Sequence, residues 1–236
     1  MRRLLASLKA TLRSLGWADG LTYLLAQSLL RVSRGYVRVY NYYLVVQPVQ
    51  DGMPVPVSRG RSIEVREIGP DDPLLDDMPH PSATNAYRFR QGGRCLAALK
   101  GGDLVGFIWW VEGPYEEDEV HCLFVPEPEG LAVWDFGVYV SPSNRLGLGF
   151  ARLWDAANKR LFADGYRYTC SRISAFNPAS LTAHRRLGAQ VVGQRLFICL
   201  GQLELSLSRQ RPRINLSVGN AYRPTVRVGL GGASSP

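Results

Sequence analysis

The sequence predicts a mixed α/β fold, in which a mixed sheet carries flanking helices and follows an N-terminal amphipathic helical extension. Three observations predict this fold. Leucines recur at steps of three and four at the start of the chain, as on one face of a helix. Alternating apolar and polar residues, typical of strands, begin at residue 62. A strand, a helix and another strand follow one another near the middle, which favours locally parallel strands.

Residues 1–50 are predicted to form the helical extension. Its first helix has a stripe of four leucines, Leu5, Leu8, Leu12 and Leu15. Asp19 is placed to cap a second helix that ends near Arg34-Gly35. The charge-free run from Gly20 to Leu30 has eleven residues, whereas a membrane span needs roughly twenty. We therefore expect no transmembrane helix, and residues 36–49 are predicted to be a strand or a helix end.

The rest of the chain divides by composition. Residues 51–61 are rich in Gly and Pro and predict a linker. Residues 62–208 are predicted to form the α/β domain, and residues 209–236 a basic C-terminal tail that can add a hairpin. The domain is expected to contain strands at 62–68, 119–126, 131–142, 166–176 and 189–208, a hairpin at 94–113, an irregular segment at 69–92, and helices at 146–165 and 178–188.

The net charge of +8 is concentrated at the two ends of the chain. Seven Lys/Arg and one Asp give residues 1–50 a charge of +6, and five Arg give residues 205–236 a charge of +5. The middle, with sixteen bases and nineteen acids, has −3. We therefore expect no nucleic-acid partner, because such domains carry their basic residues on the folded binding face. The basic amphipathic start favours an anionic membrane surface; packing on the domain or on a second copy is the alternative.

The four cysteines show no spacing typical of a zinc site or of a disulfide scaffold. We expect no metal and a reducing, cytoplasmic setting, peripheral to the inner face of the membrane if the N-terminal helices bind it.

The stretch "VYVSPSNRLGLGFARL" is a candidate phosphate-binding turn. A strand ends at Ser141, and Gly147 and Gly149 open a helix whose free N–H groups and dipole favour an anion. Arg145 can add a charged contact. The stretch is neither a dinucleotide fingerprint nor a P-loop, and a simple strand-to-helix turn is the alternative.

The stretch "SAFNPASLTAHRRLGA" is the second candidate. Asn177 follows a strand expected to run parallel to the strand that ends at Ser141, so both carboxyl ends would lie together. His184 lies two turns into the next helix, on the face of Ser180.

These motifs resemble those of the GNAT superfamily of N-acetyltransferases over residues 62–208, most strongly over residues 133–193. The family's acyl-CoA loop, [R/Q]xxGxG/A, corresponds to residues 144–149. Here the first position, where the family has Arg or Gln, is Asn144, and the arginine, Arg145, follows one residue later. Asn177 and the later "RRLGA" match the family's next motif, in the family's order.

The resemblance implies that acetyl-CoA is the acyl donor and lies between the strands at 133–140 and 168–176. Backbone groups near Val138 and Val140 would hold the pantetheine arm, with Asn177 and Ser180 nearby. The pyrophosphate would be bound by Arg145 and by the amides of Leu146, Gly147, Leu148, Gly149, Phe150 and Ala151. A primary amine would attack the thioester directly, without a metal.

His184 and Asp135 are the candidate catalytic residues. His184 takes the position of a tyrosine that faces the CoA sulfur in many relatives, so it is a candidate acid; packing alone is the alternative. Asp135 is a candidate base, which strand alternation places on the face of Tyr139 and opposite Val138. A structural carboxylate is the alternative. Glu112 and the acidic loop 115–121 are further candidates, and that loop can also attract an amine.

The leading hypothesis is therefore an acyl-CoA-dependent N-acyltransferase, acting on a small-molecule or lipid-linked amine, at the membrane surface if residues 1–50 bind it. A GNAT-like module that binds CoA or serves as a scaffold without turnover, anchored by its N-terminal helices, is the alternative.

Overall fold

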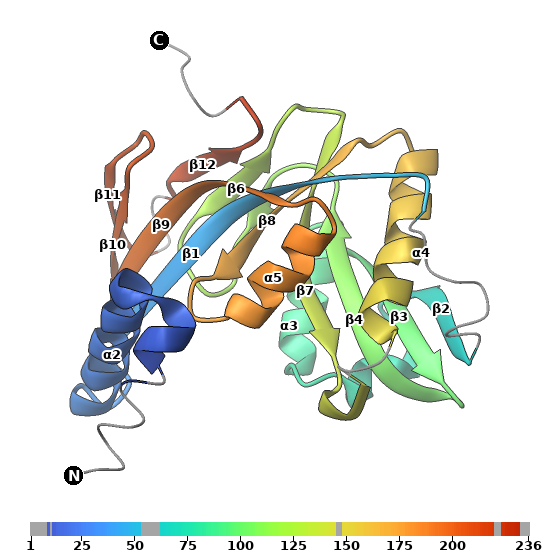
Figure 1. The fold of residues 1–236 in the computed structure, drawn as a ribbon, viewed down its shortest axis with the longest axis horizontal. Coiled ribbons are helices and arrows are strands. Elements are labelled where there is room, and N and C mark those ends of the chain that lie inside the picture. Colours follow the sequence, from blue (N-terminus) through green and yellow to red (C-terminus); the bar gives the residue numbers. More distant parts are fainter. Residues whose placement is uncertain (1–8, 10, 53–61, 145–147, 220–222, 232–236) are drawn as a thin grey trace. The chain divides into compact units, whose positions relative to one another are not determined.

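The computed structural model describes residues 9, 11–52, 62–144, 148–219 and 223–231. The chain forms two compact units. Unit 1 comprises Met1–Gln47, Glu117–Phe124 and Ser171–Pro236, and unit 2 comprises Pro48–Glu116 and Val125–Cys170. Helices and strands occur in both units, so the predicted α/β class with flanking helices is confirmed (Figure 1).

Unit 2 contains an antiparallel sheet with the strand order β2-β3-β4-β7. Its strands are β2 (Ile63–Ile68), β3 (Arg94–Lys100), β4 (Asp103–Val111) and β7 (Ala132–Val140). The turn between β3 and β4 has positive φ at Gly101 and Gly102, which the predicted Gly-Gly-Asp hairpin requires. The unit also contains β5 (Tyr115–Glu116), α3 (Ser82–Arg90), α4 (Gly149–Ala163) and the short 3₁₀ helices η1 (Pro73–Asp77) and η2 (Pro142–Asn144).

The predicted parallel strand–helix–strand unit is confirmed. It consists of β7, α4 and β8 (Tyr168–Ser174), and Ala132 to Trp134 pair in parallel with Tyr168 to Cys170. Helix α4 lies against this sheet because its apolar residues recur at helical spacing and are buried: Leu153, Trp154, Ala157 and Leu161.

Unit 1 contains a sheet with the strand order β11-β10-β9-β1-β8. Its other strands are β1 (Val37–Pro48), β9 (Gln190–Leu200), β10 (Leu203–Ser208) and β11 (Ile214–Val218), and its helices are α2 (Trp17–Val32) and α5 (Pro178–Arg186). The prediction of a separate helical extension over residues 1–50 is wrong at its boundary. Residues 37–48 form a strand between β9 and β8, so the first fifty residues supply part of the sheet itself (Figure 1).

Two further predictions need correction. Asp19 does not cap α2: Gly16 is the N-cap residue, and Asp19 lies inside the first turn. Residues 209–236 do not form their own hairpin, because β11 pairs with β10, whereas β12 (Thr225–Val228) lies beside β6 (Leu123–Pro126). No helix among the described residues is long and apolar enough to cross a membrane.

Candidate functional site

A β-bulge lies at the end of β7 in unit 2. Trp109 pairs with Phe136 and Phe107 pairs with Tyr139, so two residues of β7, Gly137 and Val138, stand opposite one residue of β4. Gly137 has a φ of 59°, which suits glycine. A bulge of this kind interrupts the alternation of side chains along a strand.

The bulge overturns the predicted orientation of Asp135. Asp135 pairs with Trp110 and Val140 pairs with Gly106, so these two residues of β7 share one face, while Tyr139 lies on the other. Regular alternation placed Asp135 with Tyr139, and that prediction is wrong because it ignored the bulge. The face of Val140 and Gly106 is the one that α4 covers, since a Cβ on Gly106 would lie 3.0 Å from Leu153. Asp135 is therefore buried on the α4 side, with 2% of its surface exposed.

The opposite face carries a cluster of stacked aromatic rings. Phe107 stacks on Tyr139 with ring centroids 5.2 Å apart, and Tyr115 stacks on Phe136 at 4.2 Å. The guanidinium of Arg88, from α3, lies 5.6 Å from the ring centre of Trp109 and 5.5 Å from that of Phe136. Arg88 is 5% exposed. Sequence reasoning missed this residue, because it lies in the segment predicted to be irregular.

The glycine at the bulge is expected to be required for stability. A Cβ on Gly137 would lie 3.2 Å from Nη1 of Arg88 and 3.2 Å from Cδ1 of Trp109, and its φ is strained for any L side chain. We expect Gly137→Ala to lower the free energy of unfolding by about 1–3 kcal/mol. Gly69→Ala is the matched control, because a Cβ on Gly69 would meet no atom within 4 Å and its φ is not positive. Urea unfolding that gives equal effects for both variants would contradict this role.

The start of α4 is the candidate anion site. Leu148 is its N-cap residue, no side chain caps the helix, and no acidic residue lies in its first turn. A Cβ on Gly149 would lie 3.4 Å from Cγ1 of Val140, so the helix begins directly against the end of β7. The first N–H groups of a helix lack acceptors within the helix and, with the helix dipole, favour an anion. The structure therefore brings together the predicted residues Val140 and Leu148–Ala151; Arg145, Leu146 and Gly147 lie outside the described residues.

Asn144 has a structural role in the turn before α4. Its amide nitrogen donates to Oγ of Ser141 at 2.8 Å and to Oγ of Ser143 at 3.2 Å. Its backbone N–H donates to the carbonyl of Ser141 at 2.9 Å. The residue that departs from the family's loop pattern thus closes the turn that leads into the helix.

His184 lies on α5 of unit 1, and Asn177 directly precedes this helix. Oδ1 of Asn177 accepts from the backbone N–H of Ser180 at 3.1 Å, so Asn177 caps the helix. Nδ1 of His184 lies 2.9 Å from the carbonyl oxygen of Ser180. Because a carbonyl only accepts, Nδ1 carries the proton, and Nε2 of the neutral ring is an acceptor.

The surroundings of His184 favour the neutral form of its ring. Burial lowers the pKa of His184, and the hydrogen bond to Ser180 opposes this only in part. The imidazole is 4% exposed. A neutral ring whose Nε2 is an acceptor can take up a proton but has none to donate there. The protonation state of this residue could not be predicted from the sequence, because it depends on the helix around it.

The acidic loop 115–121 is largely engaged in ion pairs. Glu117 binds Arg172 through two contacts of 2.6 and 2.8 Å, and Glu119 accepts from Arg172 at 2.6 Å and from the hydroxyl of Tyr42 at 2.8 Å. Burial alone raises the pKa of Glu117, but Arg172 and the N–H of Asp118 outweigh it and lower the pKa to about 2. Glu117 is thus a poor base. Glu112 is also paired, with Arg94 at 3.0 Å.

No group of His, Cys, Asp or Glu side chains suited to a metal ion occurs within the described part of the chain. The four cysteines are free thiols, and burial raises the pKa of each of them. These thiols are therefore poor nucleophiles.

No protein-family model matches the sequence, and no curated protein matches it significantly. Among solved structures, the chain is similar to a protein from Drosophila, with 20% identity, 76% of this chain and 58% of that chain covered, and a TM-score of 0.47. It is also similar to a functionally unknown protein from Staphylococcus epidermidis, with 12% identity, coverage of 72% and 65%, and a TM-score of 0.46. A third is a protein assigned to the GNAT family of acetyltransferases from Novosphingobium aromaticivorans, with 18% identity, coverage of 67% and 63%, and a TM-score of 0.45. The chain thus spans less than two thirds of the length of each of these structures.

Proposed function

We propose that this protein is an acyl-CoA-dependent N-acyltransferase that transfers an acetyl group from acetyl-CoA to a primary amine. One observation carries the proposal. An uncapped helix start without acidic residues lies directly against the end of β7, as a site for the pyrophosphate of CoA requires. The order of motifs along the sequence, which resembles that of GNAT enzymes, supports the same donor.

In this proposal, the residues of unit 2 bind the donor. Backbone groups of Val138 and Val140 hold the pantetheine arm, and the amides of Leu148–Ala151 hold the pyrophosphate. The bulge at Gly137 lies directly before these residues and interrupts the regular pairing of β7 with β4 there, as is common beside binding sites. Arg145, Leu146 and Gly147 complete the loop by resemblance to the family.

The proposed chemistry is a direct transfer. The amine nitrogen attacks the thioester carbonyl, a C–N bond forms, and the C–S bond breaks to release CoA. A base takes the proton of the attacking amine, and the thiolate is protonated from solvent; His184 is the candidate for this base. Its lowered pKa suits this task, because an imidazole that acts as a base must be unprotonated at the working pH. Asp135 has no role in this chemistry. Asn177 and Ser180 make hydrogen bonds in the helix that carries His184.

The proposal is tested by acyl transfer itself. Purified protein is incubated with acetyl-CoA and a panel of primary amines, including amino sugars and lipid-linked amines, and the release of free CoA thiol is measured. Amine-dependent release supports the enzyme. Saturable acetyl-CoA binding without release for any amine would favour the second candidate, a CoA-binding module without turnover. Asn144 and Asn177 are compatible with that candidate, because the side chain of each makes a local hydrogen bond, in the turn before α4 and at the start of α5.

We expect His184→Ala to lower kcat by about 100-fold or more, while the Kd for acetyl-CoA stays unchanged. Because burial lowers the pKa of His184, the wild-type rate should persist below pH 6.5 and then fall as the ring becomes protonated. The variant should lack this acidic limb in a pH–rate profile. His121→Ala, which removes another imidazole from unit 1, should retain it. Unchanged turnover in His184→Ala would remove this residue from the mechanism.

A further inference from the structure

One face of the unit 1 sheet consists of aliphatic side chains. Strands β9, β10 and β11 align them in three rows. The rows are Leu200–Leu203–Val218, Ile198–Leu205–Leu216 and Leu196–Leu207–Ile214. Exposure rises toward the edge strand, where Ile214 is 68%, Leu216 57% and Val218 58% exposed. Side chains that pair directly across strands share a face, so the nine residues form one continuous apolar surface.

The opposite face of the same strands is buried and largely polar, although Phe197 of β9 also lies on it. Arg195, Glu204, Ser206 and Ser217 are each at most 4% exposed. The guanidinium of Arg195 donates to Oγ of Ser206 at 3.1 Å and to the carbonyl of Pro212 at 3.1 Å. A half-exposed antiparallel sheet normally buries its apolar face and exposes its polar one. Strands β10 and β11 have the reverse polarity, which indicates that their apolar face meets something other than water.

Helix α2 lies on the same apolar face and extends it. The carboxylate of Asp19 accepts from Nδ2 of Asn41 at 3.0 Å, from Nε2 of Gln194 at 3.2 Å and from the hydroxyl of Tyr43. Asn41 pairs with Leu196, a member of the third row, so the helix is fixed beside these rows. The outer side of α2 carries a stripe of exposed apolar residues: Trp17 at 75%, Leu21 at 56%, Leu25 at 58% and Val32 at 85%.

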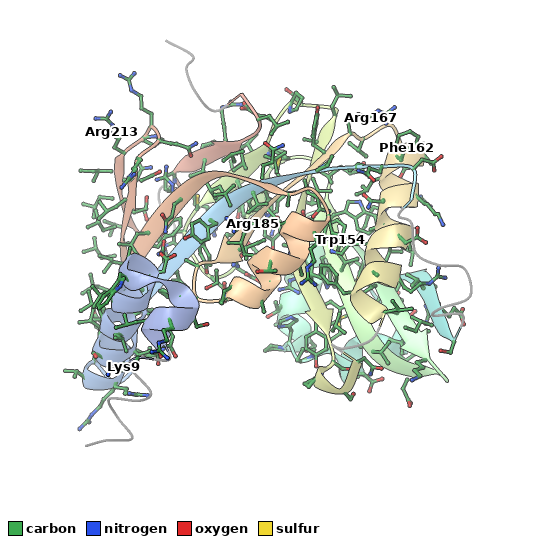
Figure 2. The ribbon with its side chains drawn as sticks, in the orientation of Figure 1. Lys9, Trp154, Phe162, Arg167, Arg185 and Arg213 are labelled. Carbon is green, nitrogen blue, oxygen red and sulfur yellow. The ribbon has the colours of Figure 1, made fainter. Side chains whose placement is uncertain are left out.

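The charges around this surface are positive. Unit 1 has sixteen Lys/Arg and five Asp/Glu, which gives a net charge of +11. Unit 2 has twelve Lys/Arg and fifteen Asp/Glu, which gives a net charge of −3. Exposed cations lie in the helical segment and in the turn between β10 and β11: Lys9, Arg13, Arg31, Arg34, Arg209, Arg211 and Arg213. Figure 2 shows Lys9 near α2 and Arg213 at the far end of the β10–β11 hairpin. Within residues 1–47 and 190–236 the only acids are Asp19, which accepts three hydrogen bonds, and Glu204, which is buried.

We propose that the outer stripe of α2 and the apolar rows of β9–β11 form one docking surface for an anionic lipid bilayer. Aliphatic side chains and Trp17 enter the interface, while the surrounding Arg and Lys bind the headgroups. A symmetric second copy is disfavoured, because it would bring two positive rims together. Nucleic acid is disfavoured, because a face of nine aliphatic side chains offers no hydrogen-bond donor to phosphates. The sequence predicted membrane binding by residues 1–50 only. The structure adds the surface of strands β9–β11, which come from the C-terminal part of the chain.

The test is sedimentation of the full chain with vesicles, and it does not depend on acyl transfer. We expect binding to vesicles of phosphatidylcholine with about one third phosphatidylglycerol, and little binding to phosphatidylcholine alone. The double variant Ile214→Asn/Leu216→Asn changes only exposed side chains of the edge strand and should weaken binding by at least about tenfold. Arg211→Ser/Arg213→Ser should weaken binding to the anionic vesicles and reduce its dependence on salt.

Leu131→Asn is the matched control, because Leu131 is a similarly exposed leucine, 44% exposed, in unit 2. It should leave vesicle binding unchanged, and circular dichroism should show that all variants are folded. Absence of wild-type binding to the anionic vesicles would overturn the proposal, as would equal binding by the double variant. A dimer in sedimentation velocity that the same double variant dissociates would show that a second copy covers the face instead.

Discussion

Gly149→Glu is expected to abolish acetyl-CoA binding, with a loss of affinity of at least about 100-fold. The substitution places a carboxylate at the uncapped start of α4, where the proposed pyrophosphate would lie. The new carboxylate and the pyrophosphate then compete for the same N–H groups, and the carboxylate offsets the partial positive charge of the helix start that favours CoA. Gly149 is buried, but its φ is not positive and a Cβ there would lie 3.4 Å from Cγ1 of Val140, so the backbone accepts a side chain; circular dichroism checks that the variant is folded. A carboxylate in the first turn of a helix even favours the helix.

Calorimetric titration of wild type and variant with acetyl-CoA measures this effect. Ala163→Glu is the matched control, because it adds the same charge at the exposed far end of the same helix. It should bind acetyl-CoA within about threefold of wild type, since exposed charges separated by more than about 10 Å are largely screened by salt. If Gly149→Glu bound acetyl-CoA as tightly as wild type, the start of α4 could not be the phosphate site.

Arg172→Met is expected to cause the largest loss of stability, about 3–5 kcal/mol in the free energy of unfolding. Arg172 binds Glu117, whose side chain is 1% exposed, and its guanidinium lies 4.3 Å from the ring centre of Tyr42. Removing the cation leaves a buried carboxylate without its partner, which costs much more than the pair contributes when intact. Urea unfolding of both proteins at pH 7 measures the difference.

The pH dependence of this loss follows from the pKa of Glu117. That pKa is lowered from 4.5 to about 2 in the folded protein, so its contribution to stability is complete above about pH 4.5 and is lost as the pH falls toward 2. The difference between wild type and Arg172→Met should therefore shrink over this range. Arg160→Met, which removes a half-exposed partner of Asp164, should cost no more than about 1 kcal/mol. Equal costs for both substitutions would refute the buried pair.

The sequence predicted the elements whose patterns are local. The helix at 149–163 has apolar residues at helical spacing, and the hairpin at 94–111 has glycines in its turn, so both were found close to their observed bounds. The parallel arrangement of β7 and β8 followed from the helix between them. Strand β1 was ambiguous, because "VYNYYLVV" carries apolar or aromatic residues on both faces and therefore lacks a strand period.

Features of the site that depend on neighbouring strands could not be predicted. The bulge at Gly137 is defined by its pairing with β4, and without that pairing the face of Asp135 was assigned wrongly. The lowered pKa of His184 depends on its burial, which the sequence of one helix does not show. The ion pair of Glu117 with Arg172 forms between residues that lie 55 positions apart in the sequence. Each of these is a tertiary effect that overrides a local pattern.

Hydrogen–deuterium exchange with and without acetyl-CoA tests the central claim most directly, because it locates the binding site on the chain. We expect slower exchange of the amides from Gly137 to Arg152, which cover the bulge, the end of β7 and the start of α4. The exchange of the amides of β11 should not change when acetyl-CoA is added. Saturating acetyl-CoA that leaves residues 137–152 unprotected, or protects another region alone, would contradict the proposed donor site.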